Sequence, residues 1–184
     1  MPVVVSMLRG VNVGVHHRIK MDALRAVYES LKLRDPRTYV QSGNVIFSTG
    51  ERNLDALAGK IEAAIAKAFG FHSDVILRTA AEMKDVIARN PFAKRDNIEP
   101  NKLLVTFLKT EPPKTVRDQV LAIKADPEEL HIRGRELYIY YPNGMARPKL
   151  SLAAVERILK IPGTGRNWNS VTRMLEMAEH LASE

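Results

Sequence analysis

The sequence predicts an α+β fold whose N-terminal half is a ferredoxin-like split βαβ arrangement, in the order β-α-β-β-α-β. Three observations predict it. Residues 3–8 form an apolar run typical of a strand buried on both faces. Apolar residues recur at helical spacing over residues 24–31 and 54–69. Ser42-Gly43-Asn44 indicates a tight turn between two short strand-like segments.

Local signals set the limits of the elements in the N-terminal half. Asp22 is the expected N-cap of the first helix, and Gly70 is expected to end the second. Thr79 and Glu82 form a capping-box pair for a third helix, which should stop before Pro91. The expected strands after the first helix cover residues 38–41, 45–48 and 74–78.

The C-terminal half predicts a second, smaller α+β subdomain. We expect residues 1–90 to form the first subdomain, residues 91–101 a linker, and residues 102–184 the second subdomain. The expected elements of the second subdomain are a strand at 102–108, a helix after Pro112-Pro113, a hairpin at 130–133 and 136–141, a helix at 152–159 capped by Ser151, and a final helix from Val171. This order is β-α-β-β-α-α, and no residue-level repeat of the first half is visible.

Composition and charge exclude several classes of protein. The chain has 184 residues, enough for one domain or two small ones. Apolar residues at 45% and charged residues at 27% are globular values, which exclude a disordered or fibrous chain. The absence of cysteine excludes disulfides, Cys-ligated zinc, iron–sulfur clusters and cysteine nucleophiles. No apolar run approaches the roughly 20 residues of a membrane span. Because a strand-like run stands where a signal peptide would begin, we expect a cytoplasmic protein without a membrane partner.

The net charge of +7 is the one unusual number in the composition. It is compatible with anionic ligands or nucleic acid, and it also keeps a protein soluble. The charge is spread evenly, without a basic tail. Two stretches, residues 9–21 and 157–175, contain bases but no acid. Both adjoin expected helix N-termini, whose free N–H groups and positive dipole end favour an anion.

The expected topology brings the first of these stretches to a turn. In a split βαβ sheet the first two strands are parallel, so the end of strand one and the turn after strand two share an edge. We therefore expect an anion site, for a phosphate- or carboxylate-bearing ligand, between the 9–20 loop and the 41–44 turn. Its candidate residues are Arg9, Gly10, Asn12, Gly14, Lys20, Gln41, Ser42 and Asn44. The alternative is that these polar groups only tie the loop to the hairpin.

A second polar cluster, residues 163–169, precedes the final helix. Gly163 and Gly165 there can form a nest of N–H donors. Its candidate binding residues are Arg166, Asn167 and Asn169. The alternative is a tight turn with an asparagine cap and a buried Trp168.

Sharper catalytic and cofactor motifs are absent. There is no Walker A sequence, and Gly163-Thr164-Gly165 lacks the third glycine and the preceding strand of a dinucleotide fingerprint. No serine lies in G-x-S-x-G. None of the five histidines has H-x-x-x-H spacing, so we expect no metal site, and no cofactor is indicated. If the chain is an enzyme, His16 or His17 is the candidate general base.

Nucleic acid is a further candidate partner, because RNA-recognition motifs share the β-α-β-β-α-β order. Those domains stack bases on aromatic residues of the two central strands. Here the first strand has no aromatic residue and the third only Phe47. Tyr138 and Tyr140 share one face of a later strand, where they would either stack on bases or pack in the sheet.

Four blocks of this sequence resemble one known family. They are Leu8-Arg9-Gly10-Val11-Asn12-Val13-Gly14, Ile19-Lys20-Met21 with Leu24-Arg25, Thr38-Tyr39-Val40-Gln41-Ser42-Gly43-Asn44-Val45, and Arg166-Asn167-Trp168-Asn169-Ser170-Val171-Thr172. On these blocks the chain resembles the domain of unknown function 1697 family over nearly its whole length. The sequence departs from that pattern at Val15-His16-His17, where a second glycine and small polar residues are usual. The resemblance implies an α+β fold with a ferredoxin-like part, and it assigns no activity.

Three functions therefore follow as hypotheses. The first is a small protein that binds an anionic small molecule at the 9–20 loop and the 41–44 turn, either as a binder or as an enzyme of phosphorylated or carboxylated substrates. The second is a nucleic-acid-binding protein. The third is a structural or interaction module without a ligand.

Overall fold

The computed structural model describes residues 1–184, which fold as two compact units. The first unit comprises Met1–Asp85 with Arg173–Glu184, and the second comprises Val86–Thr172. Eight strands form two antiparallel four-stranded sheets, one in each unit, accompanied by six α-helices. The α+β class predicted from the sequence is confirmed. None of the helices is both long enough and apolar enough to cross a membrane.

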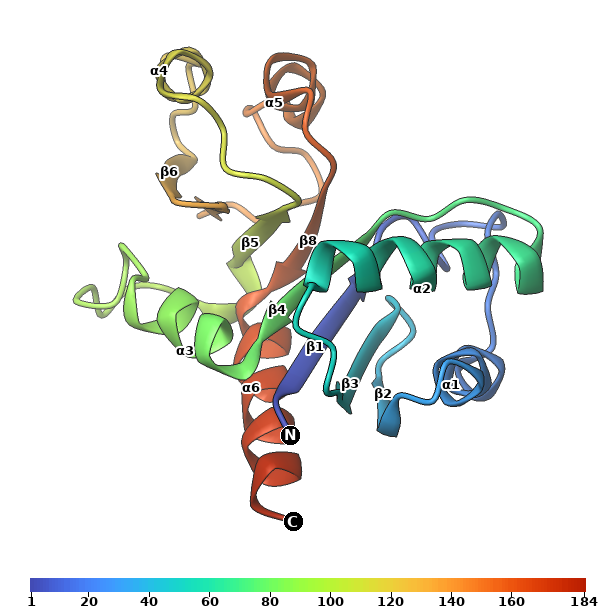
Figure 1. The fold of residues 1–184 in the computed structure, drawn as a ribbon. Helices are drawn as coiled ribbons and strands as arrows, with labels where there is room; N and C mark the ends of the chain where they lie inside the picture. The colour runs from blue at the N-terminus through green and yellow to red at the C-terminus, as the bar shows by residue number, and fades with distance from the viewer. The chain divides into compact units, whose positions relative to one another are not determined.

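The first unit has the strand order β2-β3-β1-β4, which is that of a split βαβ unit (Figure 1). Every neighbouring pair is antiparallel, so β1 and β2 point the same way. Its elements are β1 (Val3–Leu8), α1 (Met21–Ser30), β2 (Arg34–Tyr39), β3 (Asn44–Ser48), α2 (Leu54–Phe69) and β4 (Val75–Thr79).

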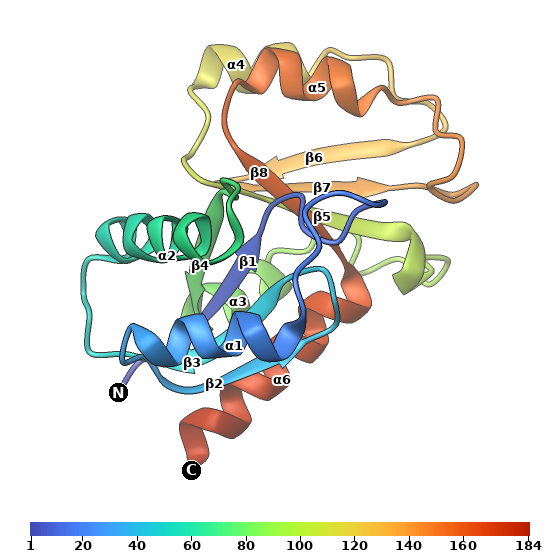
Figure 2. The ribbon, with the colours of Figure 1, turned by 90° about the vertical axis from the view of Figure 1, so that its right-hand side faces the viewer.

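Both faces of this sheet are covered. Helices α1 and α2 lie on one face (Figures 1 and 2), where Leu24 and Ile61 pack with Phe47 of β3 in one apolar cluster. Residues that point to the other face, such as Met7, are also buried, so that β1 is buried along its whole length. The C-terminal Glu184 forms an ion pair with Arg37 of β2. The predicted two-sided burial of residues 3–8 is thus confirmed.

Two sequence-based boundaries in this unit differ from the structure. Asp22 is not the N-cap: the N-cap lies two residues earlier, at Lys20, which makes no side-chain cap hydrogen bond. Strand β2 covers Arg34–Tyr39 and so excludes Gln41, and its pairing shifts register between Arg34 and Arg37. The strand passes through Pro36, which an edge strand such as β2 tolerates because one side of it has no partner.

The second unit repeats the topology of the first. Its elements are η1 (Pro100–Lys102), β5 (Leu103–Leu108), α4 (Lys114–Leu121), β6 (Glu129–Arg133), β7 (Glu136–Tyr140), α5 (Leu152–Leu159) and β8 (Gly163–Asn167). The strand order β6-β7-β5-β8 matches β2-β3-β1-β4 position by position. Helices α4 and α5 contact each other beside this sheet (Figure 2).

Strand β8 corrects the expected order β-α-β-β-α-α of the C-terminal half. Residues 163–169 were expected to open the last helix, either as a glycine nest or as a tight turn, but residues 163–167 pair with Leu104–Leu108 of β5. A Cβ at Gly163 would lie 2.9 Å from Leu108 Cδ2, so the glycine permits close packing inside the sheet. The backbone amides of a paired strand do not form an anion nest, so that part of the second candidate site is wrong.

The repeat extends to one buried charge. Arg78 is the fourth residue of β4 and lies opposite Val5, while Arg166 is the fourth residue of β8 and lies opposite Val105. Both arginines are buried. A sequence comparison of the halves misses this correspondence because the residues around the two arginines differ.

Helices α3 (Ala80–Ala88) and α6 (Trp168–Ser183) contain the points at which the chain passes between the units. Residues 91–101, expected as a linker, lie within the second unit, where Phe92 is buried. The division of the chain into two subdomains at 1–90 and 102–184 stays a prediction.

The Thr79–Glu82 capping box is present at the start of α3. Glu82 N donates to Thr79 Oγ1 at 3.1 Å, and Thr79 N donates to Glu82 Oε2 at 2.8 Å. We expect Thr79→Ala to lower the free energy of unfolding by about 1 kcal/mol, because an orphan helix N–H loses its acceptor. Urea unfolding followed by circular dichroism measures this change. Thr79→Ser keeps the hydroxyl and should recover most of the loss; equal losses in both variants would contradict a capping role.

Candidate functional site

The 9–20 loop meets the 41–44 turn at one edge of the first unit, as the strand order predicts. Leu8 N donates to Gly43 O at 2.9 Å, and Asn12 Nδ2 donates to Gln41 O at 2.6 Å. Two segments about thirty residues apart in the sequence are therefore joined by backbone and side-chain hydrogen bonds.

Asn12 holds the loop in shape. Its Nδ2 donates to Ile19 O at 3.1 Å as well as to Gln41 O, and its Oδ1 accepts from Ile19 N at 2.8 Å. Its backbone N–H donates to His17 O at 2.9 Å. Its φ of +55° lies in the left-handed region, which asparagine adopts more readily than most residues. All of these groups bind protein, so Asn12 shapes the loop.

We expect Asn12→Ala to lower the free energy of unfolding by about 2–3 kcal/mol, because three hydrogen bonds of roughly 1 kcal/mol each are lost. Chemical denaturation measures the change. Alanine at Asn12 also has to adopt the positive φ of this position. Asn12→Gly separates this backbone strain from the loss of the hydrogen bonds, since glycine accepts the positive φ but has no side chain. A glycine variant as stable as the wild type would show that these hydrogen bonds contribute nothing.

The 41–44 turn is likewise held by its own side chains. Asn44 is fully buried, and its Nδ2 donates to Tyr39 O and to Ser42 Oγ, both at 2.9 Å. Gly43 has a φ of +85° and packs under Val11 and Leu8. For Asn12, Ser42, Gly43 and Asn44 the structure therefore favours the alternative that the sequence left open, namely ties between loop and hairpin.

A cavity of about 320 Å³ opens beside these ties. Its lining residues are Asn12, Arg18, Ile19, Lys20, Met21 and Gln41. Two of them are cations, and none is acidic. Lys20 and Gln41 were candidates from the sequence; Arg18 was not, although it belongs to the base-only stretch 9–21. That charge pattern was the signal that could have found it.

The cavity lies at the beginning of α1. Lys20 and Met21 line it, and α1 starts at Met21 without a side-chain cap. The first intrahelical acceptor is Lys20 O, which binds Leu24 N at 3.0 Å. The N–H groups of the three residues before Leu24 consequently have no intrahelical acceptor. Two exposed cations and the positive end of a helix thus face the same small volume.

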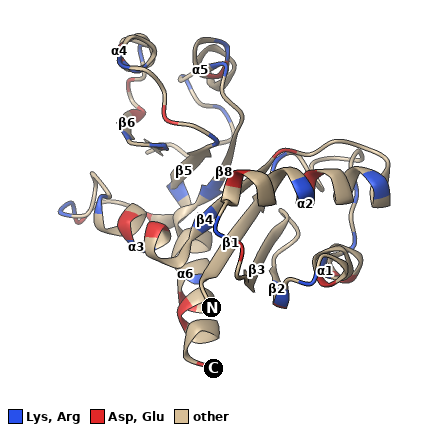
Figure 3. Cartoon of the chain, viewed as in Figure 1, with Lys and Arg blue, Asp and Glu red and all other residues tan.

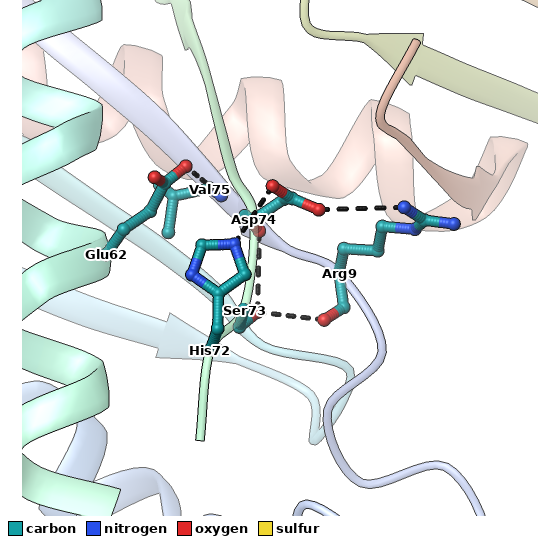
Figure 4. A network of polar contacts seen from close by, with 6 residues as sticks. All are labelled: Arg9, Glu62, His72, Ser73, Asp74 and Val75. Atoms are coloured by element: carbon teal, nitrogen blue, oxygen red, sulfur yellow. Dashed lines mark hydrogen bonds and ion pairs between the residues drawn. The ribbon is translucent and has the colours of Figure 1, made fainter. Parts of the chain in front are cut away.

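Arg9 does not line this cavity. It follows β1 and forms an ion pair with Asp74, in which Nη1 lies 3.6 Å from Oδ2 (Figure 4). Asp74 Oδ1 lies 3.2 Å from Nε2 of His72. Ser73 Oγ donates to Arg9 O at 2.8 Å, so the connection between α2 and β4 is tied to the start of the loop. The charge that was predicted to bind a ligand is already paired with a carboxylate.

A stacked pair of rings joins the connection between α2 and β4 to the 9–20 loop. The rings of His17 and Phe71 are 4.2 Å apart at an interplanar angle of 9°. The ring centroids of Phe71 and Phe69 are 6.4 Å apart, and both phenylalanines pack against the apolar core of the unit. His16, which precedes His17 in the sequence, is exposed. Gly10 and Gly14, also candidates, lie exposed in the loop with left-handed φ values.

The candidates of the second unit lie far from the cavity residues in the sequence, and Arg166 and Asn167 have structural partners. Arg166 Nη1 donates to Thr164 Oγ1 at 2.6 Å and to Gly165 O at 2.9 Å. Burial lowers the pKa of the Arg166 guanidinium to about 10. Asn167 Oδ1 accepts from Ser170 N at 2.9 Å and so caps α6, whereas Asn169 is exposed. Only the asparagine cap of the structural alternative is found, because residues 163–167 form a strand in place of a tight turn and Trp168 is only half-buried.

A larger hollow of about 480 Å³ was not anticipated from the sequence. Its lining residues are Glu29, Leu33, Asp35, Pro36 and Arg37. It contains two carboxylates, and its one cation, Arg37, already pairs with Glu184. Over most of the rest of the chain, apart from residues 157–175, basic and acidic residues are interspersed (Figure 3). The smaller cavity therefore differs from the larger one in that its lining contains two cations and no acid.

Comparison with known proteins gives a fold and a family. A search of curated protein sequences finds no match. Among solved structures, the conserved bacterial protein SP0830 from Streptococcus pneumoniae is similar, with 20% sequence identity and a TM-score of 0.69 over 96% of this chain and 98% of that one. At this identity the likeness supports the fold alone. A family model for proteins of unknown function matches residues 1–138, three quarters of the chain. The chain therefore belongs to the DUF1697 family of proteins of unknown function.

Proposed function

We propose that this protein binds a small anionic ligand, carrying a phosphate or a carboxylate, in the 320 Å³ cavity at the beginning of α1. The observation that carries the proposal is the composition of the cavity wall. Arg18 and Lys20 contribute two cations, Gln41 contributes an amide, and no acid lines the cavity. The uncapped end of α1 adds N–H donors on the same side.

The size of the site favours a small molecule over a nucleic-acid strand. Ligand sites of small molecules usually have volumes of roughly 300–1,000 Å³. The tyrosines that were candidates for base stacking are bonded inside the second unit instead. Tyr138 OH donates to Val86 O at 2.6 Å, and Tyr140 OH donates to Asn97 O at 3.1 Å. The rings of these two tyrosines, both in β7, are therefore not available for stacking on a nucleic-acid strand.

The test is a titration of the full chain with inorganic phosphate and with acetate, monitored by the thermal unfolding midpoint. A ligand that binds only the folded state raises that midpoint in a concentration-dependent way. We expect phosphate or acetate to raise it more than chloride at equal ionic strength. Equal shifts for all three salts would contradict the proposal and favour a module without a ligand. A much stronger response to a single-stranded oligonucleotide, falling steeply with added salt, would favour the nucleic-acid alternative.

A further inference from the structure

We propose that the ligand of this cavity is a phosphate monoester, bound as its dianion with a small apolar organic group against Ile19 and Met21. This inference rests on the proposed function and deepens it, because it selects one class among the phosphate- and carboxylate-bearing anions. Two properties of the lining support it, namely its set of charged donors and its apolar wall. All of the lining residues belong to the 9–20 loop, the start of α1 or the 41–44 turn.

The donors of the cavity suit a group with three terminal oxygens. Arg18 contributes a guanidinium, whose N–H groups form a fork that fits two oxygens of a phosphate. Lys20 contributes an ammonium group, and the uncapped start of α1 adds backbone N–H groups. A phosphate monoester has three oxygens that can accept from these three sources. A carboxylate has two, so it leaves one source of donors without an acceptor.

The charge of the lining favours a doubly charged anion. Two cations line the cavity, no acid does, and the end of the helix adds about half a positive charge. The acid closest to Lys20 in the sequence, Asp22, forms an ion pair with Arg25 at 3.0 Å. A phosphate monoester has a second pKa of about 6 and is a dianion above neutral pH. Because Coulomb attraction scales with the product of the charges, the same cations attract a dianion about twice as strongly as a monoanion.

Ile19 and Met21 give the cavity an apolar wall. Ile19 belongs to the apolar cluster of the first unit, and Met21 is half-buried and packs against that cluster. Inorganic phosphate has no apolar atom to place against this wall. An alkyl ester has, and each methylene group that it removes from water increases the affinity by about fourfold. The unbranched thioether side chain of Met21 adapts to organic groups of different shapes. An organic phosphate therefore uses both the charged and the apolar parts of the lining.

The experiment compares acetate, dimethyl phosphate, methyl phosphate and butyl phosphate by isothermal titration calorimetry of the full chain, at about pH 8 and constant ionic strength. Dimethyl phosphate retains the tetrahedral phosphate but is a monoanion. We expect methyl phosphate to bind on the order of tenfold more tightly than dimethyl phosphate or acetate. Butyl phosphate should bind on the order of tenfold more tightly again, through partial burial of its further methylenes. Because butyl phosphate is also the largest probe, its binding excludes a steric cause for weak binding of dimethyl phosphate.

Two variants with matched controls assign these differences to residues of the lining. Lys20→Gln should reduce the preference for methyl phosphate over dimethyl phosphate several-fold, whereas Lys67→Gln, at an exposed lysine outside the cavity, should not. Met21→Gln should weaken the binding of butyl phosphate more than that of methyl phosphate. Met145→Gln, at a partly exposed methionine outside the cavity, should change neither.

The outcomes distinguish failure of this inference from failure of the proposed function. If acetate or dimethyl phosphate bound as tightly as methyl phosphate, or butyl phosphate no more tightly than methyl phosphate, the monoester would be the wrong class and the anion site would stand. Equal preferences in Lys20→Gln and Lys67→Gln would also overturn the inference. Absence of binding by all four probes would overturn both proposals. The wild-type comparison of probes decides the question even if a variant fails to fold.

Discussion

Gly43→Ala is expected to lower the free energy of unfolding by about 3 kcal/mol, the largest effect of a Gly→Ala change in this chain. Two causes act together. The φ of +85° at Gly43 is strained for any residue with a side chain. The added Cβ would also lie 2.6 Å from Val11 Cγ2 and 3.0 Å from Leu8 Cβ, so the end of β1 would have to move.

Two other glycines separate these causes. Gly14 has a φ of +64°, but a Cβ added there would meet nothing within 4 Å, so Gly14→Ala reports backbone strain alone, about 1 kcal/mol. Gly50 has neither feature, and Gly50→Ala should be near neutral. Urea unfolding measures all three variants. If Gly43→Ala lost no more than Gly14→Ala, the packing between the 41–44 turn and the loop would be looser than the structure indicates.

Removing both cations of the cavity should abolish most of its affinity for anions. A hydrogen bond to a charged group contributes about 1.5–3 kcal/mol, or roughly tenfold or more in affinity. We therefore expect the double variant Arg18→Ala, Lys20→Ala to bind inorganic phosphate on the order of 100-fold more weakly than the wild type. Calorimetric titration of phosphate at constant salt measures this loss.

A charge-matched control isolates the site from the overall charge. Arg52 and Lys67 are exposed in the same unit and do not line the cavity. The double variant Arg52→Ala, Lys67→Ala removes the same two positive charges and should keep nearly all of the phosphate affinity. Equal losses in the two double variants would mean that phosphate responds to net charge, and the cavity would not be a site.

Elements with strong local signals could be predicted from the sequence. The apolar stripe of α2 and the left-handed Gly70 that ends it were recognisable because both depend on neighbouring residues. So was the capping box at Thr79. The meeting of the 9–20 loop with the 41–44 turn followed from strand order, which the hydrophobic pattern already implied. Each of these depends on periodicity or on contacts within a few residues.

Strand β8 could not be predicted in this way. Gly163-Thr164-Gly165-Arg166-Asn167 has no alternation of apolar side chains, and its glycines are typical of a turn. The segment is a strand because β5 offers it an unpaired edge, which is a tertiary cause. The first part of β2 was not predicted because it contains Pro36. A proline is acceptable there only because β2 lies at the edge of the sheet, which is again a tertiary cause.

The candidate site was found in outline and not in detail. A count of charges identifies a basic stretch, but it does not tell which way each basic side chain points. Arg9 turns to Asp74, which the pairing of β1 with β4 brings beside it from a distant part of the sequence. Arg18, which the sequence did not single out, lines the cavity instead. Asn12 and Asn44 were candidate ligand groups because an amide can bond to a ligand or to the protein itself, and the sequence does not distinguish the two uses.

The central claim is that an anion binds at the beginning of α1, and residue-resolved NMR during a phosphate titration tests it most directly. We expect saturable amide shifts at residues 18–23 and at Gln41, with the 163–169 segment unaffected. Linear, unsaturable changes at residues 18–23, or saturable changes centred on Arg166 and Asn169, would contradict the account.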